Sequence, residues 1–261
     1  MIAAARTEPG AAGEPVLVVD DVAKSFGPIS VLEGINLSLA AGERRALIGP
    51  NGAGKSTLFN LLSGRFAPSK GAILLNGRRI DGKPPYRLNR MGLSRSFQIT
   101  QIFNGLSLYD SIYMAVMSRH GQRWAMLRVG SVWRIIREET EQILEQAQLT
   151  PLSRRLSGTL AYSEQRALEI CMTVATGPSI ILLDEPTAGM SRAEAQTMVA
   201  FIARMTEGRT LMMVEHDMDV VFGLADTISV LCQGRILATG TPEEIRDDQR
   251  VQDAYLGGSG H

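Results

Sequence analysis

The first quarter of the chain carries three short segments typical of strands and one typical of a helix. Residues 16–19 form a continuous apolar run, residues 35–39 alternate between apolar and polar, and residues 46–48 lead into a glycine-rich turn. In residues 57–62 the leucines fall at i, i+3 and i+4, which places them on one face of a helix. Gly64 is positioned to end that helix. This order predicts strands that deliver the chain to a turn and then to a helix.

The strand pattern returns late in the chain. Residues 180–183 and 210–214 are continuous apolar runs, as expected of strands buried on both faces. Between them, Ser191 begins a sequence of the S-x-x-E form, which favours the start of a helix. A strand, a helix and a strand in this order predict a parallel α/β sheet. Residues 228–231 and 235–238 flank a Cys-Gln-Gly turn and predict a hairpin on one edge.

The middle of the chain has a different pattern. From about residue 107 to 170 it is helical and rich in Arg, Glu and Gln. Ser131 is a candidate cap for a helix with one apolar side, carried by Val132, Ile135, Ile136, Ile143, Leu144 and Ala147. This stretch is either an amphipathic layer covering the sheet or an inserted helical subdomain. We divide the chain into a flexible leader (1–14), a nucleotide-binding core (15–97 and 171–261) and a helical subdomain (98–170).

Composition and charge exclude several classes of protein. The 261 residues carry 27 Lys+Arg and 27 Asp+Glu, so the formal net charge is zero, which argues against non-specific nucleic-acid binding. With 44% hydrophobic residues the chain is not disordered, and no apolar run is long enough to cross a bilayer. Two cysteines suit a reducing compartment. The Ala/Gly/Pro-rich first residues lack the continuous apolar stretch of a secretory signal.

A phosphate-binding loop is the most specific motif. Residues 49–57 read GPNGAGKST and match G-x-x-x-x-G-K-[ST]. Glycines let the backbone turn its N–H groups around phosphate oxygens, and the helix that follows points its positive end at the same anion. Lys55 is then expected to reach the β- and γ-phosphates, and the Ser56 hydroxyl to coordinate Mg²⁺. The loop therefore predicts nucleotide binding.

Two acids and a histidine lie at predicted strand ends. Asp184 and Glu185 follow the apolar run 180–183, and His216 follows the run 210–214. The carboxyl ends of parallel strands face the ligand crevice of such a sheet. Asp184 is expected to hold Mg²⁺, directly or through water, and Glu185 to polarise the attacking water. For His216 we expect a contact with the γ-phosphate. The alternative for Asp184, Glu185 and His216 is an ordinary loop position after a strand.

Together these motifs resemble the ATP-binding subunit of ABC transporters over about residues 16–256. Phe26 matches the aromatic position that stacks on adenine, and Gln98 matches the glutamine that joins the core to the helical subdomain. Residues 160–166, LAYSEQR, lie where the family signature, commonly LSGGQ, belongs, and residues 188–191 form the loop after the acids. The resemblance implies an α/β P-loop NTPase (RecA-like) fold: a mostly parallel sheet core, an antiparallel β edge and an inserted α-helical subdomain.

The resemblance also implies ATP and Mg²⁺ as cofactors and assigns the site residues. The expected catalytic residues are Lys55, Gln98, Glu185 and His216, and the expected metal ligands are Ser56, Gln98 and Asp184. The residues expected to contact the nucleotide are Phe26, Gly49, Pro50, Asn51, Gly52, Ala53, Gly54, Lys55, Ser56, Thr57, Tyr162, Ser163 and Glu164. The signature begins a predicted helix whose free N–H groups suit a γ-phosphate. In the family this phosphate belongs to the opposite subunit, so ATP is sandwiched in a head-to-tail dimer.

The signature departs from the family pattern at two positions. The usual serine is Ala161, so one hydroxyl that could bond the γ-phosphate is absent, and the second glycine is Ser163. The aspartate often found after the acids is Ser191, which also serves as an N-cap. We expect hydrolysis to persist because Lys55 and the other catalytic residues are present.

Within the superfamily, residues 160–170, 215–218 and 251–257 look like the branched-chain amino acid (Liv-type) uptake branch, and specifically its larger ATP-binding subunit. This resemblance implies a second ATP-binding subunit, identical or paralogous, two integral membrane permeases and, indirectly, a periplasmic solute-binding protein. It also implies a peripheral place on the cytoplasmic face of the membrane. Gln101, Ile102 and Phe103 are expected to line the groove that docks a permease helix. The alternatives are a soluble ABC-type ATPase, a urea or amide importer, and a lipopolysaccharide exporter.

Overall fold

Six strands form a mostly parallel sheet in the order β10-β9-β3-β8-β7-β6. Their bounds are β3 (Arg44–Ile48), β6 (Leu93–Arg95), β7 (Ile180–Asp184), β8 (Thr210–Val214), β9 (Thr227–Cys232) and β10 (Arg235–Gly240). Neighbours pair in parallel except β10, which runs antiparallel to β9 as the predicted edge hairpin. Every residue of β7 and β8 is buried, because helices and a second sheet cover the two faces. The predicted parallel sheet is confirmed.

A separate antiparallel sheet has the order β2-β1-β4-β5. Its strands are β1 (Pro15–Phe26), β2 (Ile29–Ala40), β4 (Lys70–Leu75) and β5 (Arg78–Arg79). The predicted strands at 16–19 and 35–39 lie within β1 and β2, which are longer than the apolar runs. In β2, buried Ile35, Leu37 and Leu39 alternate with more exposed residues, so one face of this sheet is covered and the other meets solvent.

The helices of the described chain are α1 (Lys55–Leu62), α2 (Pro85–Arg90), α3 (Leu108–Arg119), α4 (Ser131–Ala147), α5 (Tyr162–Ala175), α6 (Arg192–Met205), α7 (Met218–Leu224), α8 (Pro242–Asp247) and α9 (Gln249–Leu256). Short 3-10 turns are η2 (Thr150–Leu152) and η3 (Ser157–Thr159). The computed structural model describes residues 15–96, 102–121 and 131–256. Within those ranges, no helix combines the length and the apolar composition that crossing a bilayer requires.

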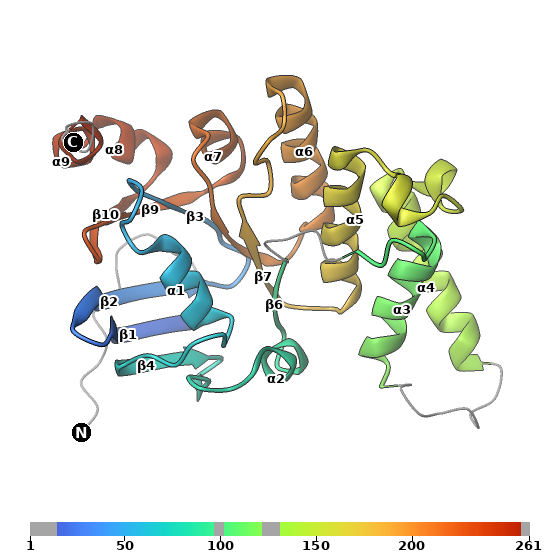
Figure 1. Ribbon diagram of the computed structural model, residues 1–261, viewed down its shortest axis with the longest axis horizontal. Helices are drawn as coiled ribbons and strands as arrows, with labels where there is room; N and C mark the ends of the chain where they lie inside the picture. Colours follow the sequence, from blue (N-terminus) through green and yellow to red (C-terminus); the bar gives the residue numbers. More distant parts are fainter. Residues whose placement is uncertain (1–14, 97–101, 122–130, 257–261) are drawn as a thin grey trace.

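The parallel sheet separates two hydrophobic cores. On one face, Leu47, Leu182 and Met212 pack with α1 and the antiparallel sheet. On the other face, Ile48 and Leu183 pack with the helices α3 to α9. This division explains why β7 is apolar at consecutive positions, since its side chains enter the two cores alternately. Figure 1 shows the resulting layers, with the antiparallel sheet at one end and α3 and α4 at the other.

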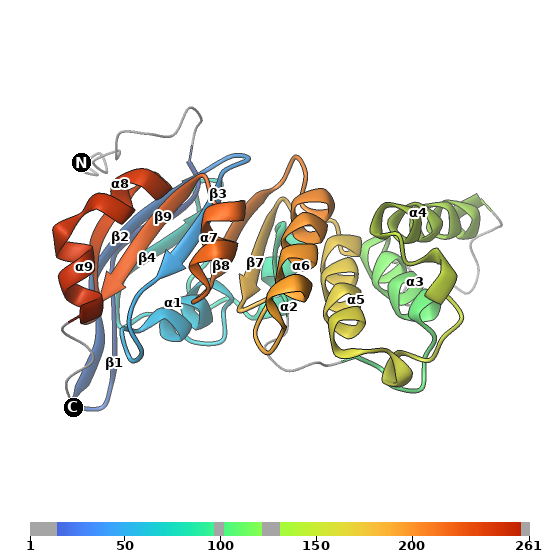
Figure 2. The ribbon, with the colours of Figure 1, turned by 90° about the horizontal axis from the view of Figure 1, so that it is seen from above.

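The helical region is built on α5. Helix α5 packs against α3 and α4 on one side and against α6 on the other, so it joins the helical region to the core, as Figure 2 shows. The boundary that we drew at residue 170 falls inside α5, and the domain division stays a prediction. In α4, Ile136 and Leu144 are buried as expected. Ile135, which we placed on the same side of the helix, is 43% exposed.

Candidate functional site

The glycine-rich loop between β3 and α1 forms one wall of a cavity. The cavity, of about 370 Å³, is lined by Val31, Asn51, Gly52, Ala53, Gly54, Lys55, Ser56, Thr57, Glu185 and His216. Lys55 is buried, and its ammonium donates hydrogen bonds to the carbonyls of Gly49 (2.7 Å) and Pro50 (3.0 Å). The loop thus brings backbone N–H groups, one lysine and two hydroxyls to a single concave surface, as an anion requires.

Two glycines of this loop have opposite surroundings. A Cβ on Gly49 would lie 2.0 Å from the carbonyl oxygen of Leu231, and its φ is +149°. A Cβ on Gly52 would meet nothing within 4 Å. The loop is therefore pressed against β9 at Gly49 and open to the cavity at Gly52. The amide of Gly234, in the β9–β10 turn, donates to the carbonyl of Ala53 (3.1 Å) and holds the loop from behind.

The electrostatics of Lys55 depend on burial. Burial lowers the pKa of its ammonium below the ordinary 10.5, and the charge of Glu185 partly offsets this effect. A charged amine that lies among carbonyls and lacks full hydration gains by meeting an anion. This environment suits a lysine whose partner is a phosphate rather than a side chain.

The carboxyl ends of β7 and β8 bring the predicted acid and histidine together. Nε2 of His216 lies 2.8 Å from Oε1 of Glu185, and both side chains are partly exposed toward the cavity. Glu185 has φ +47°, a left-handed conformation that is rare outside glycine and clusters at functional sites. The structure therefore places Glu185 and His216 across the cavity from the phosphate loop.

Asp184 lies one residue earlier and differs from Glu185 in burial. Its carboxylate Oδ2 forms a 2.6 Å ion pair with the Arg95 guanidinium, and the two side chains are 2% and 9% exposed. Sequence reasoning missed Arg95, because its partner is 89 residues away and no local pattern marks it.

Glu215, directly before His216, was also missed. Its buried carboxylate accepts hydrogen bonds from the Thr187 amide (3.0 Å), the Thr187 hydroxyl (2.6 Å) and the His216 amide (2.9 Å). The carboxylate thereby ties the loop after Glu185 to the segment that carries His216. A buried acid within the sequence Glu-His at a strand end was the available signal.

Phe26 is the last residue of β1. Its ring is 43% exposed and meets the Phe66 ring edge-on, with centroids 5.5 Å apart. The Lys24 ammonium lies 4.9 Å from the Phe26 centroid. These residues do not line the cavity described above. Phe26, Phe66 and Lys24 form an exposed aromatic corner. Phe66 was not predicted to belong to it.

The signature residues Tyr162, Ser163 and Glu164 begin α5 and do not line the cavity. The Tyr162 hydroxyl donates to the carbonyl of Ala188 (3.0 Å), so the start of α5 touches the loop after the acids. Glu164 accepts a hydrogen bond from the Ala161 amide (2.8 Å) as part of a capping arrangement. The chain by itself does not bring its signature to its own phosphate loop.

Four other predicted residues belong to the proposed permease groove or to the loop beside it. Gln98 and Gln101 lie outside the described residues. Ile102 packs partly buried against the helical core, whereas Phe103 is 53% exposed.

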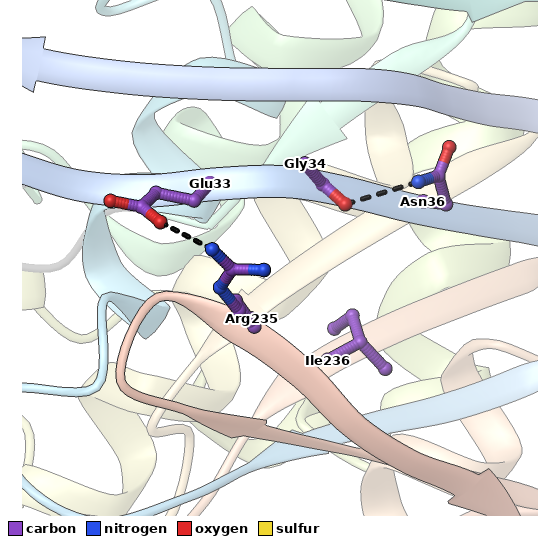
Figure 3. Close-up of a pocket in the computed structure, with 5 residues that line it drawn as sticks. All are labelled: Glu33, Gly34, Asn36, Arg235 and Ile236. Carbon is purple, nitrogen blue, oxygen red and sulfur yellow. Dashed lines mark hydrogen bonds and ion pairs between the residues drawn. The ribbon is translucent and has the colours of Figure 1, made fainter.

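A second cavity lies between β2 and the β9–β10 hairpin. It is lined by Glu33, Gly34, Asn36, Arg235 and Ile236, and the Arg235 guanidinium bonds the Glu33 carboxylate at 2.7 Å (Figure 3). Both charged side chains are well exposed. No residue of the phosphate loop lines this cavity, which we interpret as the seam between the two sheets.

The chemistry of the first cavity fits Mg²⁺ bound together with phosphates. Ser56, which lines the cavity, and Asp184, which is buried beside Glu185 and does not line it, offer the oxygen ligands that Mg²⁺ prefers. In the part of the chain that the structure describes, no cluster of three or more His, Cys, Asp or Glu side chains could hold a metal alone. Mg²⁺ commonly takes one or two protein oxygens and completes its shell with phosphate and water.

Comparison with protein families gives two matches. The model described as "ABC transporter" matches residues 32–188, and the model described as "Branched-chain amino acid ATP-binding cassette transporter" matches residues 235–261. The first match contains the phosphate loop and the acids, and the second contains β10, α8 and α9.

Similar proteins and structures agree with these matches. The chain is 37% identical over 250 residues to the high-affinity branched-chain amino acid transport ATP-binding protein BraF of Pseudomonas aeruginosa. It is also 37% identical over 251 residues to LivG of Escherichia coli, which has the same description. These alignments cover 93% and 94% of this chain and 98% of each relative. A nucleotide-free ATP-binding cassette of an ABC transporter has a TM-score of 0.79 at 26% identity, covering 93% of this chain and 99% of its own. A cassette in its ADP conformation has the same TM-score and identity, covering 94% and 99%.

Proposed function

The chain belongs to the ABC transporter family, as one of its ATP-hydrolysing subunits, and we propose that it powers the uptake of branched-chain amino acids. The observation that supports the ATPase chemistry is the Glu185–His216 pair facing the phosphate loop across one cavity. The observation that supports the solute class is the match of residues 235–261 together with the two similar transport proteins.

We propose that ATP binds with its phosphates in the loop at residues 49–57. Lys55 exchanges its two carbonyl partners for the β- and γ-phosphate oxygens, while the amides of the loop and the N-terminus of α1 face the same anion. Phe26 is proposed to carry the adenine, because its ring is exposed at the end of β1 and is supported edge-on by Phe66.

Mg²⁺ is the second proposed cofactor. Ser56 and Asp184 would hold it, with Gln98 as a further ligand. When bound, the ion neutralises charge on the phosphate oxygens. Asp184 contributes a carboxylate that its ion pair with Arg95 keeps in place.

The chain's own residues then carry the hydrolytic step. Glu185 accepts a proton from a water molecule as the water oxygen attacks the γ-phosphorus. The bond from that phosphorus to the β–γ bridging oxygen breaks, and ADP and phosphate leave. His216, whose backbone amide donates to Glu215, would hold Glu185 through its ring and meet the γ-phosphate. The balance is one water consumed for each ATP cleaved.

A second ATP-binding subunit is proposed to complete the site. The start of α5 carries Tyr162, Ser163 and Glu164 and does not line this chain's own cavity. A head-to-tail arrangement would present these residues to the nucleotide of the partner subunit. Two permease subunits would dock beside Phe103, on the cytoplasmic face of the membrane, and a solute-binding protein would deliver the amino acid from the other side.

The test is reconstitution of the complete transporter in vesicles. ATP-driven uptake of radiolabelled leucine and the release of phosphate would be measured together, with Glu185→Gln as the control that binds nucleotide and turns over slowly. We expect uptake and phosphate release to fall together in the control, relative to the wild-type protein. Phosphate release without leucine uptake would contradict the solute class. Turnover no faster than that of the control would contradict hydrolysis at this site.

A further inference from the structure

The Arg95 guanidinium occupies a buried position between the phosphate-loop helix and the end of β7. Its Nη2 donates to Oδ2 of Asp184 at 2.6 Å. Its Nη1 donates to the side-chain oxygens of Asn60 (2.8 Å) and Ser63 (2.9 Å), both at the C-terminal end of α1. One side chain therefore bonds the helix that begins with Lys55 and the strand that ends with Asp184.

The ion pair uses only one of the two carboxylate oxygens. Among the described residues, no group donates a hydrogen bond to Oδ1 of Asp184. Oδ1 does not, however, belong to the completely buried polar atoms that lack a hydrogen-bond partner. Oδ2 is thus held, while Oδ1 is left for another partner within a side chain that is only 2% exposed. A carboxylate at a metal site needs this arrangement, because its second oxygen is usually fixed by an outer hydrogen bond.

We propose that Arg95 is a positioning residue for the metal ligand Asp184. By linking Oδ2 to the C-terminal end of α1, it would fix the carboxylate relative to Ser56 at the other end of that helix and leave Oδ1 for the metal, although Asp184 does not line the cavity itself. The inference rests on the proposed function, since it concerns the metal that accompanies the nucleotide. It adds a residue that has no part in nucleotide contact or in the hydrolytic step.

The geometry of the guanidinium matters as well as its charge. Arginine presents its donors in a planar fork, so it can bond two acceptors on α1 and one on β7 at once. Lysine would place the same charge near Asp184 on a single nitrogen. It could not donate hydrogen bonds to Asp184, Asn60 and Ser63 in the same three directions. Charge and positioning are therefore separable by comparing Arg95→Met with Arg95→Lys.

The experiment measures ADP affinity of the full chain by calorimetry, with and without Mg²⁺. ADP avoids hydrolysis, and the ratio of the two dissociation constants reports the gain from the metal. For Arg95→Met we expect this gain to fall by about tenfold or more, the size typical of removing an outer partner of a metal ligand. ADP affinity without Mg²⁺ should stay near the wild-type value. Arg95→Lys should recover little of the gain.

A matched control is Arg45→Met. Arg45 forms a buried 2.7 Å ion pair with Glu43 in the same sheet, and neither residue lines the cavity. This variant should lose stability and keep the metal-dependent gain. If Arg95→Met fails to fold, the double variant Asn60→Leu/Ser63→Ala removes the α1 acceptors and leaves the ion pair. We expect a smaller fall in the gain for this double variant.

The possible outcomes separate the inference from the proposed function. An unchanged gain in Arg95→Met, or in the double variant, would overturn the positioning role. Full recovery in Arg95→Lys would show that charge alone acts and would overturn it too. A wild-type protein that binds ADP equally with and without Mg²⁺ would instead contradict the proposed cofactor.

Discussion

Nε2 of His216 lies 2.8 Å from Oε1 of Glu185, although 31 residues separate them in the chain. Glu185 follows β7 and His216 follows β8 after one intervening residue, and these strands are parallel neighbours. The pairing of the strands therefore creates the contact, with Glu215 holding the backbone of His216 beside the loop that contains Thr187. The pair is therefore a property of the sheet.

His216→Ala should slow ATP turnover and leave ADP affinity near the wild-type value. The variant removes the group that holds Glu185, and contributions from positioned acid–base groups are typically about 10²- to 10⁴-fold. Turnover would be measured on the reconstituted transporter, and ADP affinity by calorimetry. His120→Ala is the matched control, because His120 pairs with Glu139 at 3.0 Å in the helical region. Equal turnover in the two variants would contradict the role of His216.

Lys55 should make nucleotide affinity fall at alkaline pH. Burial lowers the pKa of its ammonium from 10.5, so the amine loses its proton earlier than an ordinary lysine. ADP affinity should decline as the pH rises through this lowered pKa. The stability of the nucleotide-free protein should instead increase as the pH rises. In the same window the unfolded chain binds more protons, so the free energy of unfolding should rise with pH until about 10.5. Calorimetry and urea unfolding check the two trends, and Lys55→Met should abolish both.

Gly49→Ala should destabilise the protein more than Gly77→Ala. Both residues have positive φ, and an alanine in a left-handed conformation costs about 1–2 kcal/mol. Only at Gly49 would the new Cβ also meet a carbonyl, that of Leu231 at 2.0 Å, whereas a Cβ at Gly77 meets nothing. Urea unfolding measures the difference. Equal losses would mean that the loop does not press against β9.

Glu215→Ala should cost stability and turnover together. The change leaves the buried donors of Thr187 without an acceptor, at about 1–3 kcal/mol for each unpaired buried group, and also leaves the part-buried amide of His216 without its partner. It also frees the loop that carries Glu185. Glu194→Ala, in the exposed cap of α6, serves as the control, since it should cost only about 1 kcal/mol and spare turnover. A Glu215→Ala protein with full turnover would contradict the positioning described here.

The two cysteines should differ in reactivity. Burial raises the pKa of the Cys171 thiol to about 12, and the side chain is fully enclosed by the helical core. Cys232, at the end of β9, is partly exposed. Iodoacetamide should label Cys232 in the folded protein and both residues in urea, as mass spectrometry of peptides would show. Labelling of Cys171 in the folded protein of a Cys232→Ser variant would contradict the packing of α5.

The local patterns predicted more of the fold than of the site. Local sequence predicted the strands at 180–183 and 210–214 and the helix that begins after Ser191. Burial and helix capping depend on the types of neighbouring residues, which the sequence shows directly. Arg95 and Glu215 were not, since each acts through partners brought near by strand pairing. The left-handed backbone of Glu185 likewise has no signal in residue type. The second sheet was not distinguished from an edge of the first, because the apolar alternation of β2 suits both.

The position of β3 in the sheet has a consequence for synthesis of the protein. Arg44 of β3 pairs with Leu211 of β8, Leu47 pairs with Ser229 of β9, and Ala53 of the phosphate loop is held by Gly234. A chain emerging from the ribosome thus presents the loop long before the residues that shape it. Nucleotide cannot bind a nascent chain in the native way until residue 234 has appeared. Until residues 210–214 have appeared, both edges of β3 lack their native neighbours, and an unpaired strand edge can pair with other chains.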